Sequence, residues 1–516
     1  MQKQTQSQLA IIDLGSNSAR LVIYEQDAQG LLYESENVKR VLRLSSHLVN
    51  GKLDDRGVQT TLDCMRHFKE ICEGRGVTEV VGVATAAMRQ ARNGPALRDQ
   101  IQQETGFDFR ILTGPEEAHY GYLAVVNSMN IRDAFTVDIG GGSTEVTWVE
   151  ERACVHKISF PFGAVTLTQL FFKSDLPSRE ELGQLELFLR QQFAGAPWLT
   201  MRKRPVPLIA LGGAARNVGN MHQRKNNYSF PSLHHYILPR AEIVETYQTL
   251  AKTPLDKRKK IKGLSKDRAD IIVAASAVFQ VLMELTGSEE FVISTKGLRE
   301  GLLFERILQE QNLEYLDDVS LYSAHQWMKR YRVDAPRAEH VSRLAISLFD
   351  QLNDQGLLLA GYEERRLLKI SGLLQDIGLS INVYDAAKHT FYLITNVLLF
   401  GMTHRQRLIT ALLASYKNDK KLEKQFMQHT DMLPAAELSG IKRLALLGLL
   451  ARTLDRPLTN QVRSISLEKR GNECMVICQV IEQHLVDQAQ VTEILDAMSK
   501  SFRQTFRLEL VEKGIT

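Results

Sequence analysis

The chain has 516 residues, of which 44% are hydrophobic and 24% are charged, with a formal net charge of +4. This composition is typical of a globular protein and excludes a disordered or fibrous one, while the length predicts about three domains. So small a charge excess gives no indication of a nucleic-acid partner, and we expect none.

Nothing in the sequence predicts insertion into a membrane. The first eight residues contain no apolar signal core. The apolar run Leu444–Ala451 is far shorter than the ~20 residues needed to span a bilayer. We therefore expect a cytoplasmic protein without an integral membrane segment. Its five cysteines are scattered along the chain, which favours small core residues over a disulfide framework or a zinc site.

The first 315 residues alternate between strand patterns and helix patterns. In chain order we expect a β-hairpin over 8–25, a helix over 58–73, strands over 79–84 and 108–112, a second hairpin over 135–149, a helix over 179–192, a strand over 208–210, a helix over 268–286, and a strand over 291–294 that leads into a helix starting near Gly297. Such alternation predicts an α/β layered fold.

From about Leu313 onward the apolar residues take helical spacing. We expect helices over 321–331, 337–352, 363–374, 404–414 and 441–455, and strand signals return only at 465–482. The two predicted hairpins divide the earlier part near residues 128–133. These changes predict three domains, over residues 1–128, 129–315 and 316–516.

The two predicted hairpins are near copies of each other. In each, an apolar strand ends in Asp-x-Gly, turns through small residues and returns as a second strand. The aligned pairs are Asp13 with Asp138, Gly15 with Gly140, and Ser18 with Ser143. Small turn residues let backbone N–H groups approach an anion, and a carboxylate at the strand end can hold a cation or its water shell. One such turn is also typical of an ordinary hairpin. Two of them predict paired grips on a phosphate chain and its magnesium.

Three further motifs follow predicted strands. Glu116 and Glu117 stand where a helix begins, and acids there either complement the helix dipole or supply a base for cleaving a phosphoanhydride. Arg89 follows the strand over 79–84, and it either binds phosphate oxygens or is exposed on a helix. Gly212 and Gly213 form a strand-to-helix turn whose amides bind phosphate or cap the helix.

Together these motifs resemble the exopolyphosphatase/guanosine pentaphosphate phosphohydrolase (Ppx/GppA) family. The matching stretches are, in the family's order, 13–18, 84–89, 114–118, 138–145, 212–217 and 298–301. The resemblance implies two actin-like, ribonuclease H-like ATPase-superfold α/β domains around a cleft, followed by an all-α HD-like domain with a small C-terminal β/α extension. The Glu-Glu-Ala element after Gly-Pro indicates the phosphatase branch of that superfold.

The resemblance also implies roles for single residues. Glu117 is expected to be the catalytic base that activates water, Glu116 to support it, and Arg89 to orient the terminal phosphate. Magnesium is the implied cofactor, and the residues expected to hold it, partly through water, are Asp13, Asp138 and Glu145. The residues expected to bind phosphate are Ser16, Asn17, Ser18, Gly140, Gly141, Gly142, Ser143, Thr144, Gly212 and Gly213.

The helical region resembles an HD-type, metal-dependent phosphohydrolase-like domain. The positions that match its ligand pattern are His340, Asp376 and Asp455. The sequence departs from that pattern at Gln375-Asp376, where His-Asp is expected, and at Tyr416-Lys417, where a further histidine is frequent. Because an amide replaces imidazole poorly as a transition-metal ligand, we expect a scaffold that shapes the substrate path and no second hydrolytic centre. We interpret His389 and His404 as helix-surface residues.

The resulting hypothesis is a processive, magnesium-dependent exopolyphosphatase that releases orthophosphate from inorganic polyphosphate. The closest alternative is removal of the 5′-terminal phosphate of guanosine pentaphosphate. A sugar or acetate kinase of the same superfold is disfavoured by the Glu-Glu-Ala element. A non-catalytic nucleotide-sensing module is disfavoured by the intact Glu117, Asp13 and Asp138. The resemblance further implies a homodimer.

Two basic clusters leave two interpretations open. One comprises Lys257–Lys260 with Lys262, Lys266 and Arg268, and the other is Arg202–Arg204. Such clusters either line a channel for a long polyanion or form an ordinary solvated face.

Overall fold

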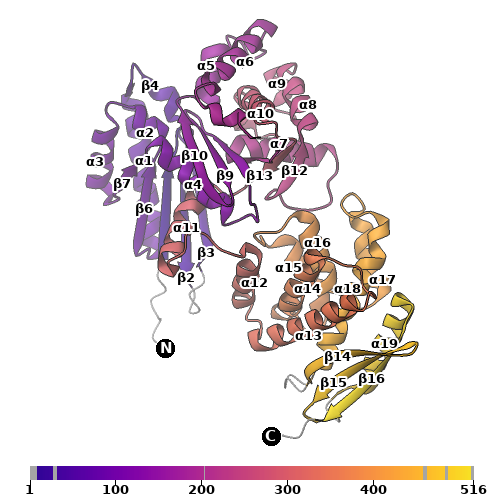
Figure 1. Cartoon of the computed structure of the whole chain (residues 1–516). Helices are drawn as coiled ribbons and strands as arrows, with labels where there is room; N and C mark the ends of the chain where they lie inside the picture. The colour runs from indigo at the N-terminus through magenta and orange to yellow at the C-terminus, as the bar shows by residue number, and fades with distance from the viewer. Residues whose placement is uncertain (1–7, 27–31, 203, 457–461, 483–485, 513–516) are drawn as a thin grey trace. The chain divides into compact units, whose positions relative to one another are not determined.

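The computed structural model describes residues 8–26, 32–202, 204–456, 462–482 and 486–512 (Figure 1). Contacts divide the chain into two compact units. The two-sheet unit comprises the chain up to Asn227 together with Leu233–Asp317, and the helical unit comprises Tyr228–Ser232 and the chain from Asp318 onward. Among the described residues, no helix combines the length and apolar character that crossing a bilayer requires.

The first sheet of the two-sheet unit has five strands in the order β3-β2-β1-β6-β7. They are β1 (Gln8–Leu14), β2 (Ser18–Gln26), β3 (Leu32–Val41), β6 (Glu79–Ala84) and β7 (Phe109–Ile111). The first three strands are antiparallel neighbours, whereas β6 pairs in parallel with β1, and β7 in parallel with β6. A two-stranded ribbon, β4 (Leu48–Val49) with β5 (Lys52–Leu53), follows β3.

The helices of this first half are α1 (Asp55–Arg75), α2 (Ala86–Gln90) and α3 (Gly94–Thr105). Helix α1 begins where the Asp54 carboxylate accepts a hydrogen bond from the Gly57 N–H at 2.7 Å, and it ends at Gly76, whose φ of 72° is the left-handed conformation that glycine adopts without strain. Its buried face, which includes Met65 and Phe68, packs into a core with the inner residues of the sheet.

The second sheet repeats this plan. Its order is β10-β9-β8-β11-β13-β12. Its strands are β8 (Ala134–Ile139), β9 (Thr144–Glu150), β10 (Ala153–Phe160), β11 (Leu208–Leu211), β12 (Tyr236–Pro239) and β13 (Glu290–Ile293). Here too an antiparallel run of three strands comes first, and parallel strands β11 and β13 extend the sheet beyond β8. The sequence repeat around Asp13 and Asp138 is therefore a repeat of topology.

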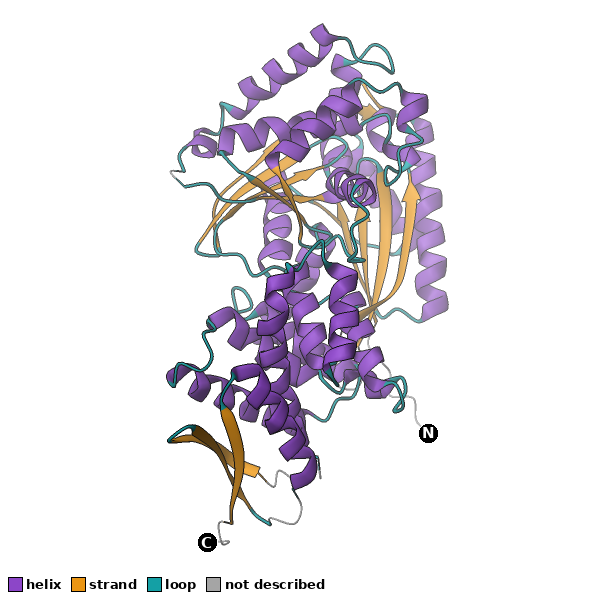
Figure 2. Ribbon diagram, turned by 90° about the vertical axis from the view of Figure 1, so that its right-hand side faces the viewer, coloured by secondary structure: helices purple, strands orange, loops and turns teal. Residues whose placement is uncertain are grey.

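Helices flank the strands of the two-sheet unit, as Figure 2 shows. Those of its second half are α5 (Ala164–Phe171), α6 (Arg179–Phe193), α7 (Gly212–Lys225), α8 (Arg240–Ala251), α9 (Leu255–Arg258) and α10 (Ile272–Thr286). The helix expected over 268–286 begins later, at Ile272, because Lys266–Arg268 form a separate 3₁₀ turn. Helix α10 is almost wholly buried and packs against α5, α6 and α8.

Two helices connect the halves of the two-sheet unit. Helix α4 (Gly114–Val126) follows the first sheet but packs against β8, β9 and β10 of the second. Helix α11 (Leu298–Gln311) follows the second sheet but packs against α4 and contacts β1 of the first. Each half thus contributes one helix that packs against the other half. These two helices hold the two sheets in place relative to each other.

The helical unit has its own hydrophobic core. Its helices are α12 (Val319–Arg330), α13 (Ala335–Asp354), α14 (Tyr362–Leu374), α15 (Ala386–Asn396), α16 (His404–Ala414), α17 (Asp419–Phe426), α18 (Leu438–Leu454) and α19 (Gln488–Phe502). A small sheet in the order β14-β15-β16 packs with α13 and α19. Its strands are β14 (Val462–Arg470), β15 (Glu473–Val480) and β16 (Thr505–Glu512). Cys474 and Cys478 are buried on β15, as small core residues should be.

A five-residue segment that precedes β12 belongs to the helical unit. Phe230 is 1% exposed within the helical core, and the side chain of Ser229 donates a hydrogen bond to Asp431 at 2.6 Å. Tyr228 bonds His404 at 2.9 Å. The interpretation of His404 as a helix-surface residue is wrong, because this ring is buried at the start of α16 against Phe230.

Candidate active site

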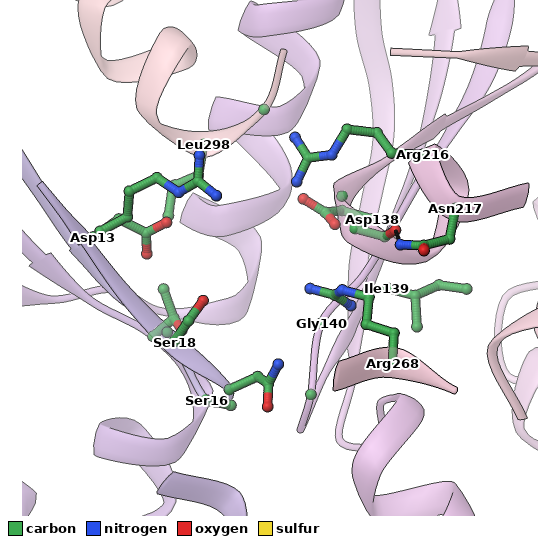
Figure 3. Close-up of a pocket in the computed structure, with 18 of the residues that line it drawn as sticks. Asp13, Ser16, Ser18, Asp138, Ile139, Gly140, Arg216, Asn217, Arg268 and Leu298 are labelled. Carbon is green, nitrogen blue, oxygen red and sulfur yellow. Dashed lines mark hydrogen bonds between the residues drawn. The ribbon is translucent and has the colours of Figure 1, made fainter. Parts of the chain in front are cut away.

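A polar cleft of about 420 Å³ opens between the two sheets of the two-sheet unit. Figure 3 shows Asp13, Ser16 and Ser18 on one wall, with Asp138, Arg216 and Arg268 on the other. Of the residues predicted for the site, those that line the cleft are Asp13, Ser16, Asn17, Ser18, Glu117, Asp138, Gly140, Gly141, Ser143, Glu145, Gly212 and Gly213. The structure therefore brings most of the predicted set together.

The two copied turns have the same internal geometry and touch each other. The Gly15 N–H donates to the Ser18 carbonyl at 3.1 Å, and the Gly140 N–H donates to the Ser143 carbonyl at 2.9 Å. A Cβ atom placed on Gly141 would lie 3.2 Å from the Cβ of Ser16. Small residues are thus required where the turns meet, and such turns let backbone amides come close to an anion.

Polar groups of the first turn divide between structural and ligand-facing roles. The Ser16 hydroxyl accepts a hydrogen bond from the Ala87 N–H at 3.1 Å, so it holds the start of α2. The Nδ2 atom of Asn17 is buried and has no hydrogen-bond partner among the described residues, although Asn17 lines the cleft. A buried amide without a partner is costly, and a phosphate oxygen would satisfy it.

Glu117 is the buried acid of the cleft. It lies in the first turn of α4, 8% exposed, with Arg89 Nη1 at 3.0 Å from its Oε1 and the Ser143 hydroxyl at 3.4 Å from its Oε2. Burial raises the pKa of Glu117, and the Arg89 guanidinium opposes that rise. Arg89 itself does not line the cleft, and it also donates to the Leu112 carbonyl at 2.6 Å. Its position is that of a residue that holds the acid.

Glu145 forms a tightly coupled pair with Glu117. Burial, followed by the Glu117 and Asp138 carboxylates, raises the pKa of Glu145 well above its ordinary range. The Ser159 hydroxyl donates to its Oε1 at 2.7 Å. The Arg89 guanidinium favours the charged form of Glu117, whereas burial and the neighbouring carboxylates disfavour the charged form of Glu145.

Besides Arg89, three predicted site residues lie outside the cleft lining. Glu116 accepts bonds from the backbone N–H and hydroxyl of Thr113, both at 2.7 Å, and so closes a capping box at the start of α4. The Thr144 hydroxyl donates to the Phe162 carbonyl at 2.7 Å. The Gly142 carbonyl accepts from the side chain of Gln90. Glu116 therefore positions the helix that carries Glu117 rather than facing a ligand.

Asp13 and Asp138 are the carboxylates best placed for a cation. Burial raises the pKa of both, that of Asp138 to about 6, as expected for acids enclosed without enough positive charge. Gly212 has a φ of +80°, and a Cβ there would lie 2.5 Å from the Asp138 carboxylate, so glycine makes room for this side chain. Among the described residues no three His, Cys, Asp or Glu side chains converge as a metal cage. This donor set fits magnesium, which keeps water and phosphate oxygens as ligands, and it does not fit a closed metal site.

Cations that the predicted site set did not include also line the cleft, and of these only Arg268 belongs to a predicted basic cluster. The cations that line the cleft are Arg20, Lys39, Arg216, Arg268, Lys296 and Arg299. Burial lowers the pKa of Arg216 and of Arg268, and a Cβ on Gly213 would lie 2.2 Å from Arg268 Cζ, so this guanidinium rests on the start of α7. Each of these arginines lies within one of the sequence motifs described above or just after one. That position in the sequence is the signal that could have identified them.

The predicted basic clusters do not act as units. Arg268 enters the cleft, whereas Arg258 is buried and donates to the Thr253 and Ala269 carbonyls, both at 2.8 Å. Arg202 is held by Asp133 and Glu150 at 3.0 Å each. Lys203 lies outside the described residues. Lys257, Lys259 and Lys260 are exposed, which leaves both interpretations of this cluster open.

An arginine neutralises the HD-type positions of the helical unit. Arg337 Nη1 lies 2.7 Å from Asp376, and its Nε lies 3.6 Å from Asp455, which is fully buried. His340 lies 3.9 Å from the same Asp455. The guanidinium thus bridges the two carboxylates that the HD-type pattern would assign to a metal.

Comparison with known proteins agrees with this geometry. The model described as "Ppx/GppA phosphatase family" matches residues 22–310, and the model described as "Ppx/GppA phosphatase, domain III" matches residues 319–501. A guanosine-5′-triphosphate,3′-diphosphate pyrophosphatase of Pseudoalteromonas atlantica is 26% identical over 77% of this chain and 77% of its own length. A protein of the same name from Aeromonas hydrophila is 27% identical over 86% of this chain and 88% of its own.

Solved structures give the same picture over more than half of the chain. The Ppx/GppA family member of Aquifex aeolicus is 29% identical, with a TM-score of 0.51, over 59% of this chain and 98% of its own. An exopolyphosphatase from Cytophaga hutchinsonii, 22% identical with a TM-score of 0.55 over 60% of this chain and 99% of its own, shares the fold.

Proposed function

Because the chain belongs to the Ppx/GppA phosphatase family, a family of hydrolases, we propose that it cleaves the terminal phosphoanhydride of inorganic polyphosphate and releases orthophosphate. One observation carries the proposal. Glu117, a buried carboxylate paired with Arg89, lies beside Ser143 of the second copied turn in a cleft lined by six cations.

The chain's own residues account for the chemistry in this proposal. The amides of the two turns and the cleft arginines hold the oxygens of the terminal phosphate. Glu117 accepts a proton from a water molecule as that water attacks the terminal phosphorus in line. The bond from phosphorus to the bridging oxygen breaks, and the electron pair stays on the shortened chain. Magnesium at Asp13 and Asp138, when bound, supplies neutralisation of phosphate charge. Preorganised charge supplies most of the catalysis in such reactions.

The character of the cleft favours an inorganic chain as substrate. Among the described residues that line it, the apolar ones are Ile139, Ile271 and Leu298, and none is aromatic. Aromatic rings are the common platform on which proteins stack a base. A cleft of arginines, amides and carboxylates is suited to phosphates alone.

Guanosine pentaphosphate is the second candidate substrate. The observation that favours it is the name carried by the two relatives, which align with 77% and 86% of this chain. Both substrates present a terminal phosphate to the same acid, so the reaction is the same and only recognition of the remainder differs.

The test is orthophosphate release from long polyphosphate, tripolyphosphate and guanosine pentaphosphate, assayed in parallel with magnesium and with a chelator. We expect magnesium-dependent turnover of polyphosphate, with a higher kcat/KM than for the nucleotide. A higher kcat/KM for guanosine pentaphosphate than for polyphosphate would identify the nucleotide as the substrate. Absence of orthophosphate release from all three compounds would refute a phosphoanhydride hydrolase. Phosphate transfer to a sugar or acetate would indicate the kinase alternative. The homodimer and the cytoplasmic location stay predictions, the first testable by light scattering.

A further inference from the structure

Two ion pairs connect the halves of the two-sheet unit beside the cleft. Lys39, near the end of β3, lies 3.1 Å from Asp267, and Arg43 lies 3.5 Å from Asp270. The cations belong to the half that carries the first turn, whereas the carboxylates lie on the segment before α10. Lys39 is also part of the cleft lining. These four side chains are a third to a half exposed, so a ligand in solution can reach them.

The segment that carries the two cations is hydrogen-bonded to the first copied turn through Arg43. The backbone N–H of Arg43 donates to the Asn17 carbonyl at 2.9 Å, and Arg43 adopts a φ of 52°, an unusual conformation for a residue with a side chain. The segment that carries both cations is therefore anchored beside the turn that we propose holds the terminal phosphate.

The carboxylates are held just as firmly. Asn217, on α7, accepts hydrogen bonds through its Oδ1 from the N–H of Ser265 at 2.7 Å and from its hydroxyl at 3.1 Å. Arg268, the neighbour of Asp267, rests on Gly213 inside the cleft. Asp267 and Arg268 thus project from one fixed turn, one toward Lys39 and the other toward Asp138.

We propose that Lys39 and Arg43 form a subsite for the phosphates next to the terminal one, and that Asp267 and Asp270 compete with those phosphates for it. The proposal rests on the proposed function and adds a determinant of substrate affinity. A phosphate carries more charge and more acceptor oxygens than one carboxylate. The polyphosphate therefore displaces the two carboxylates, and the free energy lost is that of two exposed ion pairs. Burial raises the pKa of Asp267, but hydrogen bonds from Lys39 and Ser265 outweigh burial and lower that pKa below its ordinary value.

The test measures binding, not turnover. Inorganic tripolyphosphate is titrated calorimetrically into the full chain carrying Glu117→Gln, with and without Asp267→Asn. We expect Asp267→Asn to lower the Kd about two- to fivefold, the range that an exposed ion pair supplies, and added salt to shrink the gain. Asp256→Asn on α9 is the matched control, since it removes the same charge from an exposed site away from the cleft lining.

A double-variant comparison identifies the mechanism. In a Lys39→Ala background Asp267→Asn should give no gain, because the contested cation is gone. Asp270→Asn with Arg43→Ala repeats the test at the second pair. The proposal would be overturned if the Kd were unchanged or higher in both Asp267→Asn and Asp270→Asn, or if no variant bound tripolyphosphate. It would also be overturned if the gain in affinity equalled that of Asp256→Asn, or if that gain persisted without Lys39. Failure of orthophosphate release in the unmodified chain would instead refute the proposed function and leave this titration valid.

Discussion

The Ser143 hydroxyl lies 3.4 Å from Oε2 of Glu117. Ser143 closes the second copied turn, and Glu117 opens a helix that follows a strand of the other sheet. A carboxylate from one half of the unit therefore meets the copied turn of the other half. This contact places the acid at the site that we propose for the terminal phosphate.

Replacing the acid should separate chemistry from binding. We expect Glu117→Gln to lower kcat about a hundred- to ten-thousandfold, the usual contribution of a general base, while KM changes little because the amide keeps the shape of the side chain. Steady-state orthophosphate release measures both constants. Retention of more than half the kcat would remove Glu117 from the role of base.

The neighbouring acid should respond differently. Glu116 closes the capping box of α4, and bonds from the Thr113 N–H and hydroxyl lower its pKa. A group whose pKa is lower in the folded protein stabilises the fold above its ordinary pKa of 4.5 and loses that effect as pH falls through the folded value. Glu116→Gln should therefore lower Tm at pH 7, and the difference from the parent should vanish in acid. Thermal melts between about pH 3 and pH 7, a range that begins below the ordinary pKa of Glu116, measure this difference in Tm.

A methyl group on Gly213 should damage substrate binding. Its Cβ would lie 2.2 Å from the Arg268 guanidinium, so Gly213→Ala must displace that cation from the cleft. We expect KM for tripolyphosphate to rise roughly tenfold, which corresponds to about 1.4 kcal/mol of lost binding. Gly183→Ala on α6 is the control, because no atom lies within 4 Å of its Cβ and alanine favours helix by about 1 kcal/mol. An unchanged KM in Gly213→Ala would argue against a binding role for Arg268.

The bridging arginine of the helical unit should matter for stability and not for metal binding. Arg337→Met removes the guanidinium from Asp376 and the fully buried Asp455, and loss of one partner of a buried pair costs about 3–5 kcal/mol. Arg365→Met breaks an exposed pair with Asp350 and should cost at most about 1 kcal/mol. Chemical denaturation measures both.

Added manganese provides the complementary check at this position. Because Arg337 already bridges both carboxylates, we expect manganese to leave the Tm of the helical unit unchanged. A rise in Tm that His340→Ala abolishes would show that these side chains still bind a metal.

Local signals predicted the parts of the site that one stretch of chain builds. The Asp-x-Gly turns at Asp13 and Asp138 fold as copies because their spacing and small residues are local properties. Glu117 was found because a motif marks it. Glu116 was expected beside it, and only the geometry of the capping box separates the two acids.

Long-range placement could not be predicted in the same way. Arg20, Arg216, Arg268 and Arg299 converge from four distant segments, and nothing in the spacing of any one segment indicates the others. The same holds for Phe230, since the other buried residues of the helical core begin only at Ala324, 94 residues further along the chain.

The segment Tyr228–Ser232 makes the two units harder to separate than a single linker would. The chain crosses between them after Asn227, after Ser232 and again after Asp317. A truncation at Asp317 would expose Phe230 to water in the part that is kept. It would also leave a cavity of the same size in the helical core of the part that is removed. Limited proteolysis at one junction would not release either half, and a gene encoding the catalytic part alone would need new residues in place of these five.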